Sequence, residues 1–209
     1  LTFFFFLDKL AAVNPTYLPR IHEYGLAARS SSMYLVTDEV DGTTWADAAI
    51  NDSDKLGVIE RLTDAVEHLH GLGISHGDLH PRNVMLDKEN GNVYLIDIPD
   101  FSHNTAEARN HRYSPENIDG SSSEQRDIFA VLRMSCEMLG LEWCEESNTY
   151  PRVSDAIQSE LNDVEFGFKD LGRFKKAITS AAKVEEQKFV EILLNGIDEQ
   201  ATIFPDNGH

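Results

Sequence analysis

The sequence is poor in basic residues and in cysteine. It holds 18 Lys and Arg against 36 Asp and Glu, which gives a formal net charge of −18 at pH 7. A chain this acidic repels phosphate groups, which argues against a general nucleic-acid or anionic-membrane surface. The two cysteines, Cys136 and Cys144, form no metal-ligand pattern. They favour reduced thiols in a cytoplasmic protein, and a pairing between them stays open.

Long apolar runs are also missing. No stretch approaches the ~20 apolar residues that span a bilayer, and the segment from Phe3 to Leu7 is far too short. We therefore expect no membrane partner and find no signal peptide. The hydrophobic content of 41% and the length of 209 residues suit a globular chain of one or two domains. The first residue is Leu, so we expect a processed product or part of a longer polypeptide.

Hydrophobic spacing predicts an α+β fold in which a few strands are followed mostly by helices. Strands are expected at 18–24 and 33–40, with a serine loop between them. A hairpin is expected from 84–86 and 93–96, because its turn carries Asn90-Gly91. Asn51 to Ser53 offers capping side chains for a following helix. Helices are expected over residues 4–13, 54–70, 128–139, 153–164, 170–182 and 184–195, of which 128–139 should be buried.

Three polar side chains converge around the predicted hairpin. Asn83 precedes its first strand and Asp97 follows its second, so the hairpin folds them back toward each other. Their oxygens are ligands that suit Mg²⁺. A third acid, Asp78, lies upstream on the same loop. Together they supply a hydroxyl-orienting group and a metal clamp, which are the minimum requirements of phosphoryl transfer. The alternative is that the Asp and Asn of the loop are simple turn formers.

These residues sit in motifs that resemble the protein kinase superfamily. The segment 76–83, His-Gly-Asp-Leu-His-Pro-Arg-Asn, looks like the kinase catalytic loop, and Asp97 stands where the metal-binding Asp of the DFG motif belongs. Residues 113–116, Tyr-Ser-Pro-Glu, resemble the APE motif. Asp127 and the following apolar helix resemble the buried helix of the kinase C-lobe, and 33–42 resembles the fifth strand and hinge. Five motifs in the right order cover roughly residues 5–140.

The resemblance implies specific roles and two cofactors, ATP and Mg²⁺. Asp78 would orient the substrate hydroxyl, and His80 stands where Ser/Thr kinases have a phosphate-contacting Lys. Asn83 and Asp97 would bind Mg²⁺ at the ATP phosphates. Thr37 would be the gatekeeper, and the backbone of Asp38 and Val40 would bind adenine. Asp127 would accept hydrogen bonds from catalytic-loop amides, or would be an ordinary helix N-cap. The resemblance thus implies Asp78, His80 and Asn83 as catalytic residues and adds Thr37, Asp38, Val40 and Asp97 for the nucleotide site.

The chain also departs from the kinase pattern. Gly77 replaces the Arg that usually reads a phosphorylated activation loop. Ile98-Pro99 replaces Phe-Gly after Asp97, and the register Asp100-Phe101-Ser102 is a less favoured alternative. No Gly-rich loop and no Val-Ala-Ile-Lys strand is found. We therefore expect a partial N-lobe over 1–40 and a C-lobe over 41–209. The rest of the N-lobe would come from upstream sequence or another chain, or be lost.

The leading interpretation is phosphoryl transfer to a Ser/Thr hydroxyl of a protein substrate, within a larger or split kinase. One rival is a small-molecule phosphotransferase of the aminoglycoside or choline type, where His-Gly-Asp-Leu-His-Pro is also typical. The residues 113–116 favour a protein substrate. The other rival is a pseudokinase that acts as an interaction module, although all three polar residues are present. We expect the 209-residue chain alone to transfer phosphate poorly, because it offers no strand Lys and no glycine-rich lid.

Overall fold

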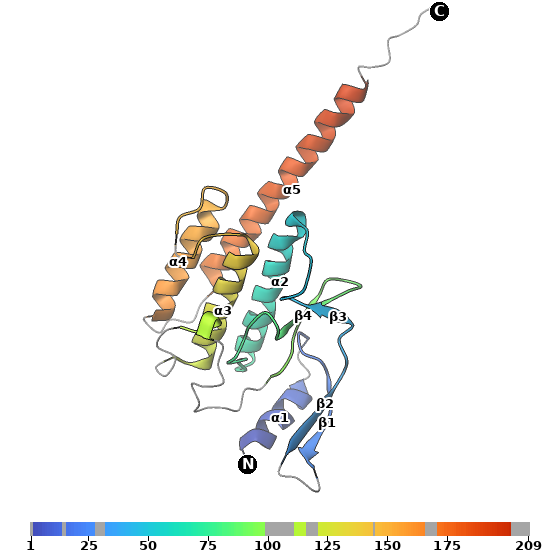
Figure 1. Cartoon of the computed structure of the whole chain (residues 1–209), viewed down its shortest axis with the longest axis vertical. Helices are drawn as coiled ribbons and strands as arrows, with labels where there is room; N and C mark the ends of the chain where they lie inside the picture. The colour runs from blue at the N-terminus through green and yellow to red at the C-terminus, as the bar shows by residue number, and fades with distance from the viewer. Residues whose placement is uncertain are drawn as a thin grey trace, which may run out of the picture.

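The computed structural model describes residues 2–13, 16–27, 32–98, 111–115, 121–143, 145–165 and 171–201. The fold is α+β, as predicted (Figure 1). Its elements are, in chain order, α1 (Thr2–Val13), β1 (Ile21–Leu26), β2 (Met33–Thr37), β3 (Gly42–Thr44), α2 (Asp52–Gly71), β4 (Val84–Asp87), β5 (Val93–Leu95), the 3-10 turn η1 (His111–Tyr113), α3 (Ser123–Met138), α4 (Pro151–Glu165) and α5 (Gly172–Ala201).

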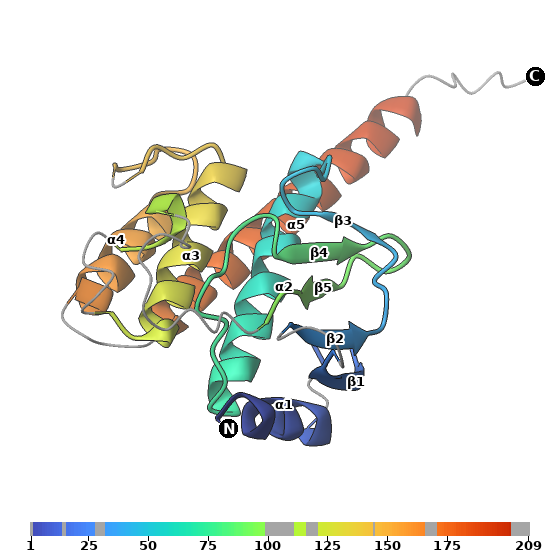
Figure 2. The ribbon, with the colours of Figure 1, turned by 60° about the horizontal axis from the view of Figure 1, so that its bottom comes forward.

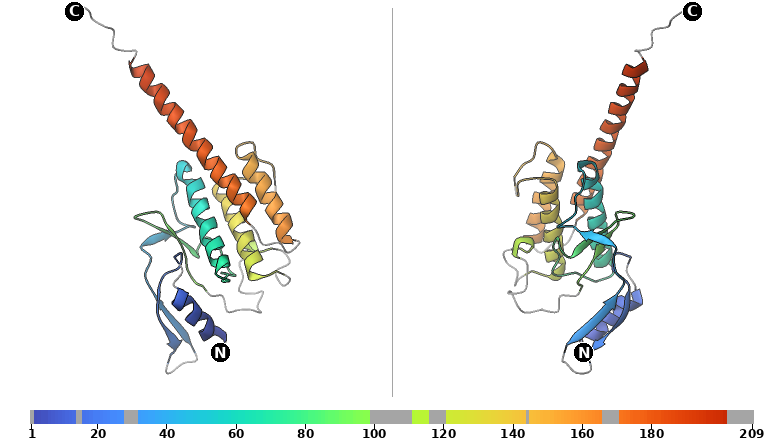
Figure 3. Two further views of the ribbon diagram at one scale, coloured as in Figure 1. Left: turned by 180° about the vertical axis from the view of Figure 1, so that it is seen from behind. Right: turned by 45° about the vertical axis from the view of Figure 1, so that its right-hand side comes forward.

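Four helices form the larger part of the molecule. Helix α2 packs against α3 and α5, and α4 packs against α3 and α5. Their apolar faces meet in one core, whose fully buried members include Ile59, Leu62, Leu132, Phe174 and Ile178. Figure 1 and Figure 3 show α1, β1 and β2 at the opposite end from this bundle, and α5 continuing well past it. Within the described residues, no helix is both long and apolar enough to cross a bilayer.

The expected hairpin is present, with one strand added. Strands β4 and β5 pair antiparallel, and Gly91 takes a positive φ of 66° in their turn. The sequence reading missed β3, which pairs with the outer edge of β4 (Figure 2). Gly42 permits this pairing, because a Cβ at that position would lie 2.4 Å from the carbonyl oxygen of Leu86.

A separate two-stranded sheet precedes the bundle. Strands β1 and β2 pair antiparallel from Ile21 opposite Thr37 to Leu26 opposite Met33. The predicted 18–24 strand begins three residues later and ends two residues later than expected. Helix α1 packs against β1 and buries Leu7 and Leu10. The loop predicted at residues 30–32 lies mostly outside the described residues.

Helix α3 begins earlier than the apolar pattern predicted. Ser122 caps it through a reciprocal box, in which the Gln125 amide donates to the Ser122 hydroxyl and the Ser122 amide donates to the Gln125 side chain. Asp127 therefore lies inside the helix, and its interpretation as an N-cap is wrong. At α2 the N-cap residue is Asn51, within the predicted capping segment, but the helix begins at Asp52, two residues before the predicted 54, and the Asn51 side chain makes no capping hydrogen bond.

The last two predicted helices are one helix, so the division between 182 and 184 is wrong. No Gly or Pro interrupts the sequence there, and the backbone ladder of α5 runs through. The start of α5 is held by the buried carboxylate of Glu160 on α4. That carboxylate accepts from the backbone amides of Arg173 at 3.0 Å and Phe174 at 3.2 Å. A carboxylate stabilises a helix N-terminus because it meets free N–H groups.

Candidate active site

The loop between α2 and β4 carries Asp78 and Asn83. Helix α2 ends at Gly71, and Gly73, two residues later, takes a φ of +66°. Gly77 has a φ of +83°, a left-handed conformation that a side-chain-bearing residue adopts only with strain. The loop is therefore bent sharply one residue before Asp78.

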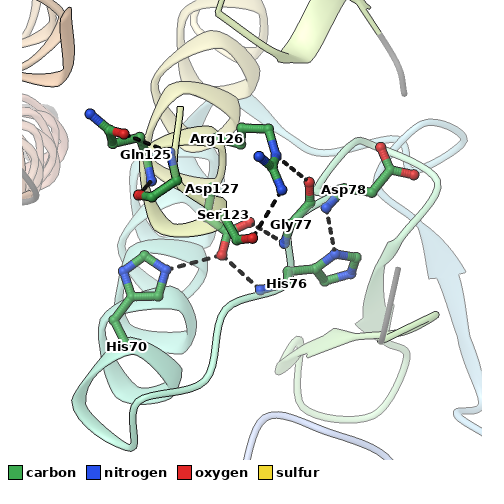
Figure 4. Close-up of polar contacts among 9 residues, drawn as sticks. His70, His76, Gly77, Asp78, Ser123, Gln125, Arg126 and Asp127 are labelled. Carbon is green, nitrogen blue, oxygen red and sulfur yellow. Dashed lines mark hydrogen bonds and ion pairs between the residues drawn. The ribbon is translucent and has the colours of Figure 1, made fainter. Parts of the chain in front are cut away.

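A single buried carboxylate fixes the first half of this loop (Figure 4). Asp127 of α3 is 1% exposed. Its two oxygens accept from the amide nitrogens of His76 and Gly77, both at 2.7 Å, and the Nε2 atom of His70 lies 3.0 Å away. The structure thus confirms that Asp127 binds loop amides. Charged acceptors on backbone amides make strong hydrogen bonds, so this contact holds the loop against the helical core.

The hairpin brings the three expected polar residues together. Asn83 donates its side-chain N–H to the backbone carbonyl oxygen of Asp78 at 3.0 Å. The backbone carbonyl of Asn83 accepts from the Ile96 amide at 2.9 Å. Asp97 follows directly and is exposed. It takes a φ of +57°, the one positive value among the described non-glycine residues. Asp tolerates this conformation better than most residues, and such strain clusters at functional sites.

His80 faces the carboxylate of Asp78. The His80 Nε2 atom lies 3.9 Å from an Asp78 oxygen, and its Nδ1 atom accepts from the Arg82 amide at 3.2 Å. Burial lowers the pKa of His80, because it disfavours the charged imidazolium, while the carboxylate of Asp78 acts in the opposite direction. Because Nδ1 accepts from the Arg82 amide, the N–H of the neutral imidazole lies on Nε2, the ring nitrogen nearer Asp78.

A cavity of about 340 Å³ opens between the two sheets. Its lining includes the expected residues Thr37, Asp38, Val40 and Asp97, together with Met85 and Ile96. The Asp38 amide donates to the Arg20 carbonyl at 2.9 Å, and no backbone amide of the described residues donates to the Asp38 carbonyl. Among the described residues no backbone acceptor faces the Val40 amide. This strand edge thus offers an acceptor and a donor beside an apolar floor, the pattern that a nucleobase edge requires.

Asn83 and Asp97 are also the chain's candidates for holding Mg²⁺. Asn83 uses its amide nitrogen on Asp78, so its side-chain oxygen is the atom left for a metal. In the described part of the chain no group of three or more His, Cys, Asp or Glu side chains could hold a metal ion alone. Two hard oxygen donors fit Mg²⁺, which keeps several waters and takes further ligands from phosphates.

Residues 111–115 are anchored to α3 next to the loop. Glu137 accepts from Arg112 Nε at 2.8 Å and from the Tyr113 hydroxyl at 2.7 Å. Burial and this carboxylate raise the pKa of Tyr113 to about 12. Tyr113 and Glu137 line a second cavity of about 380 Å³ with Pro81 of the loop. Glu116 and the alternative register at 100–102 lie outside the described residues.

Sequence reasoning missed two polar residues of the loop environment. His76 is buried, and its Nε2 atom lies 2.8 Å from the Ile96 carbonyl oxygen. Arg126 reaches the same loop from α3. The signal for His76 is its place inside the motif at 76–83. Nothing in the local pattern around Arg126 indicates a contact 49 residues away.

Comparison with known proteins agrees with this geometry. A family model described as a protein kinase domain matches residues 18–194. The chain belongs to the protein kinase family.

Among curated relatives, the chain is 23% identical to the probable serine/threonine-protein kinase PknB of Lactococcus lactis, over 85% of this chain and 34% of that protein. It is 26% identical to the serine/threonine-protein kinase PrkC of Bacillus subtilis, over 56% of this chain and 20% of that protein. The chain thus spans about a third or less of the length of these relatives.

Solved kinase domains share the fold. The Mycobacterium tuberculosis PknI kinase domain superposes with a TM-score of 0.62 at 16% identity, covering 84% of this chain and 75% of that one. The maize SIRK1 kinase domain bound to AMP-PNP gives a TM-score of 0.62 at 13% identity, covering 84% of this chain and 78% of that one. At these identities the likeness concerns the fold alone.

Proposed function

We propose that this chain carries the catalytic half of an ATP- and Mg²⁺-dependent protein kinase that phosphorylates Ser or Thr hydroxyls. One observation carries the proposal. Asn83 donates to the backbone carbonyl of Asp78 and accepts, through its own backbone carbonyl, from the amide of Ile96, the residue before Asp97. Asp97 in turn lines the cavity that also holds the strand edge of Asp38 and Val40. This arrangement suits a nucleotide in the cavity with its phosphates directed toward the loop.

Each residue has a definite task in this proposal. Asp38 and Val40 hold the base through their backbone, and Thr37 lies beside it. Asn83 and Asp97 hold Mg²⁺, which neutralises phosphate charge when it is bound.

The oxygen of the substrate hydroxyl bonds to the γ-phosphorus, and Asp78 accepts the proton of that hydroxyl. At the same time the bond between the γ-phosphorus and the oxygen that bridges to the β-phosphate breaks. ADP leaves with the electron pair of that broken bond. The imidazole N–H of His80, held 3.9 Å from Asp78, orients either the carboxylate or the transferring phosphoryl group.

A protein acceptor is favoured over a small molecule by the anchored segment 111–115. Glu137 fixes Arg112 and Tyr113, and Tyr113 and Glu137 line a cavity together with Pro81 of the loop that carries Asp78. The two named relatives are serine/threonine-protein kinases, which supports the same choice. The His-Gly-Asp-Leu-His-Pro sequence keeps an aminoglycoside- or choline-type acceptor as the second candidate.

We also propose that a further strand completes the nucleotide site, from the same polypeptide or from another chain. Strand β2 pairs with β1 on one side, and Tyr34, Leu35 and Val36 are each at least 38% exposed. Among the described residues β1 is the one strand that pairs with β2, so the other edge of β2 has no strand beside it there, which is costly for a two-stranded sheet. Without that addition we expect the 209-residue chain to transfer phosphate poorly, because the sequence offers no strand Lys and no glycine-rich lid for the phosphates.

The test is a transfer assay on the full-length protein with γ-labelled ATP. Dephosphorylated casein serves as the protein acceptor, and kanamycin and choline serve as small acceptors. Label on Ser or Thr of the protein supports the proposal, whereas label on kanamycin or choline alone supports the second candidate. ATP binding without any transfer, and unchanged by Asp78→Asn, would indicate a pseudokinase.

A further inference from the structure

Arg126 is a buried cation behind the loop that carries Asp78. It is 8% exposed, and each of its nitrogens makes a hydrogen bond. The Nε atom donates to the Gly77 carbonyl at 2.9 Å, one terminal nitrogen donates to the Ser121 carbonyl at 3.0 Å, and the other donates to the Ser123 hydroxyl at 2.9 Å. Figure 4 shows the guanidinium between the start of α3 and the loop.

The position of Asp78 depends on the peptide groups on either side of Gly77. Glycine has more backbone freedom than any other residue, so a loop that turns at Gly77 needs outside contacts to hold one conformation. Asp127 holds the Gly77 amide at 2.7 Å, and Arg126 holds the Gly77 carbonyl, which belongs to the peptide bond leading into Asp78. The second contact thus acts on the peptide plane that aims the Asp78 side chain.

We propose that Arg126 is a positioning residue for Asp78, acting through the Gly77 carbonyl; this rests on the proposed function of Asp78. Neighbouring residues of α3 then hold the two polar groups of Gly77, Asp127 by its negative charge and Arg126 by its positive charge. A charged donor makes a hydrogen bond roughly twice as strong as a neutral one.

Geometry favours positioning over the other task a buried arginine could have, which is binding an anion. The hydrogen bonds engage the whole planar fork, and the group is 8% exposed. A phosphate reaching it would have to displace the Gly77 and Ser121 carbonyls. Space is not the reason for glycine at position 77, because a Cβ there would lie 3.5 Å from Arg126, an ordinary contact. Position 77 requires glycine because its φ is +83°. The sharp bend at Gly77 and the hydrogen bond from Arg126 to its carbonyl therefore act together.

Two variants on the same helix separate positioning from stability. Arg126→Met removes the guanidinium group and keeps a long, unbranched apolar side chain. Arg133→Met is the matched control, because Arg133 also donates to a side chain and stacks on Trp143 at 4.6 Å, but it does not touch the loop. Arg126→Lys keeps the charge and offers a single donor group, and it serves as the second variant if Arg126→Met fails to fold.

The first measurement is hydrogen–deuterium exchange of a peptide covering residues 74–83, in the full-length protein. We expect faster exchange in Arg126→Met, an intermediate rate in Arg126→Lys and the native rate in Arg133→Met. The second measurement is the kinetics of phosphoryl transfer. A misaimed Asp78 should lower kcat by roughly 10²-fold with KM for ATP unchanged, because a small displacement of a reacting group costs about that much.

The proposal is overturned if both Arg126 variants exchange at the native rate in 74–83, or if kcat falls no more in Arg126→Met than in Arg133→Met. If the wild-type protein transfers no phosphate, the proposed function fails. Altered exchange in 74–83 would then show that Arg126 holds the loop but does not serve catalysis.

Discussion

The imidazole Nε2 atom of His76 lies 2.8 Å from the carbonyl oxygen of Ile96. This contact joins the loop that carries Asp78 to the end of the strand that precedes Asp97. The two acids therefore belong to one hydrogen-bonded unit, although 18 intervening residues separate them in the sequence. A change on either side of the contact should affect how the other acid is held.

Asp78→Asn should abolish most phosphoryl transfer while fold and ATP affinity persist. The side chain is partly exposed and lies outside the apolar core, so its charge is needed for chemistry more than for packing. Loss of a positioned base typically costs ~10²–10⁴-fold in rate. Steady-state kinetics of the full-length protein measures this, with Asp155→Asn on the exposed face of α4 as the control. A loss below about tenfold would remove Asp78 from the role.

Asp97→Asn should remove the Mg²⁺ dependence of ATP affinity. Asn tolerates the +57° φ of this position, so the variant deletes the charge and keeps the backbone. Asp97→Ala should in addition lose roughly 1–3 kcal/mol of stability through backbone strain. Isothermal titration of ATP with and without Mg²⁺ checks the first outcome. Asp41→Asn, at an exposed position, is the control. An equal loss of Mg²⁺ dependence in that variant would indicate an effect of net charge and not the loss of a metal ligand.

Asp127→Ala should destabilise the protein far more than removal of a surface carboxylate. It leaves the buried amides of His76 and Gly77 without their acceptor, at roughly 1–3 kcal/mol each. Asp64 provides the contrast. Its ion pair with Lys175, 2.8 Å long, is over a third exposed, and such pairs contribute about 0–1 kcal/mol. Urea unfolding compares the two variants, and similar midpoints would contradict the anchoring role.

His80 should make stability fall on the acidic side of neutrality. Burial lowers its pKa in the folded state below the ordinary 6.5, so the unfolded chain binds the proton first as the pH drops. The contribution to stability is complete above pH 6.5 and is lost as the pH falls through the lowered folded-state pKa. Urea midpoints measured between about pH 7 and pH 5 should depend less on pH in His80→Gln. An unchanged slope in that variant would assign the effect elsewhere.

Two glycine substitutions should act in opposite directions. Gly42→Ala places a Cβ 2.4 Å from the Leu86 carbonyl and should cost about 1–3 kcal/mol by forcing β3 away from β4. Gly71→Ala meets nothing within 4 Å at the end of α2 and should be neutral or stabilising by up to about 1 kcal/mol. Thermal unfolding of both variants checks the pair. An unaffected Gly42→Ala would mean that β3 does not pair as described.

Local patterns in the sequence were enough for much of this fold. The helix before Gly71 and the hairpin around Asn90-Gly91 follow from hydrophobic period and turn chemistry, and both were predicted correctly. The motif at 76–83 predicted a polar site next to that hairpin. Asp127 was expected to contact the loop amides, which it does.

Features that depend on distant partners were not predictable in the same way. Strand β3 is three residues long, and its pairing exists only because β4 offers an edge beside Gly42. The hydrogen bond from Arg126 to the Gly77 carbonyl joins elements that lie far apart in the sequence. Helix α3 starts at a capping box of polar residues, which the apolar pattern after Ile128 does not reveal.

The contacts of Asp127 carry a consequence for how the chain folds. They link His76 and Gly77 to a helix about 50 positions later, so they cannot form while the segment from α2 to β5 is still on its own. Contacts of long sequence separation form only after the entropy of closing the intervening loop has been overcome. The loop should therefore take its working shape in a late step, when α3 docks. A nascent chain that ends before residue 127 would then contain all of the motif at 76–83, but its loop would not yet have its folded conformation.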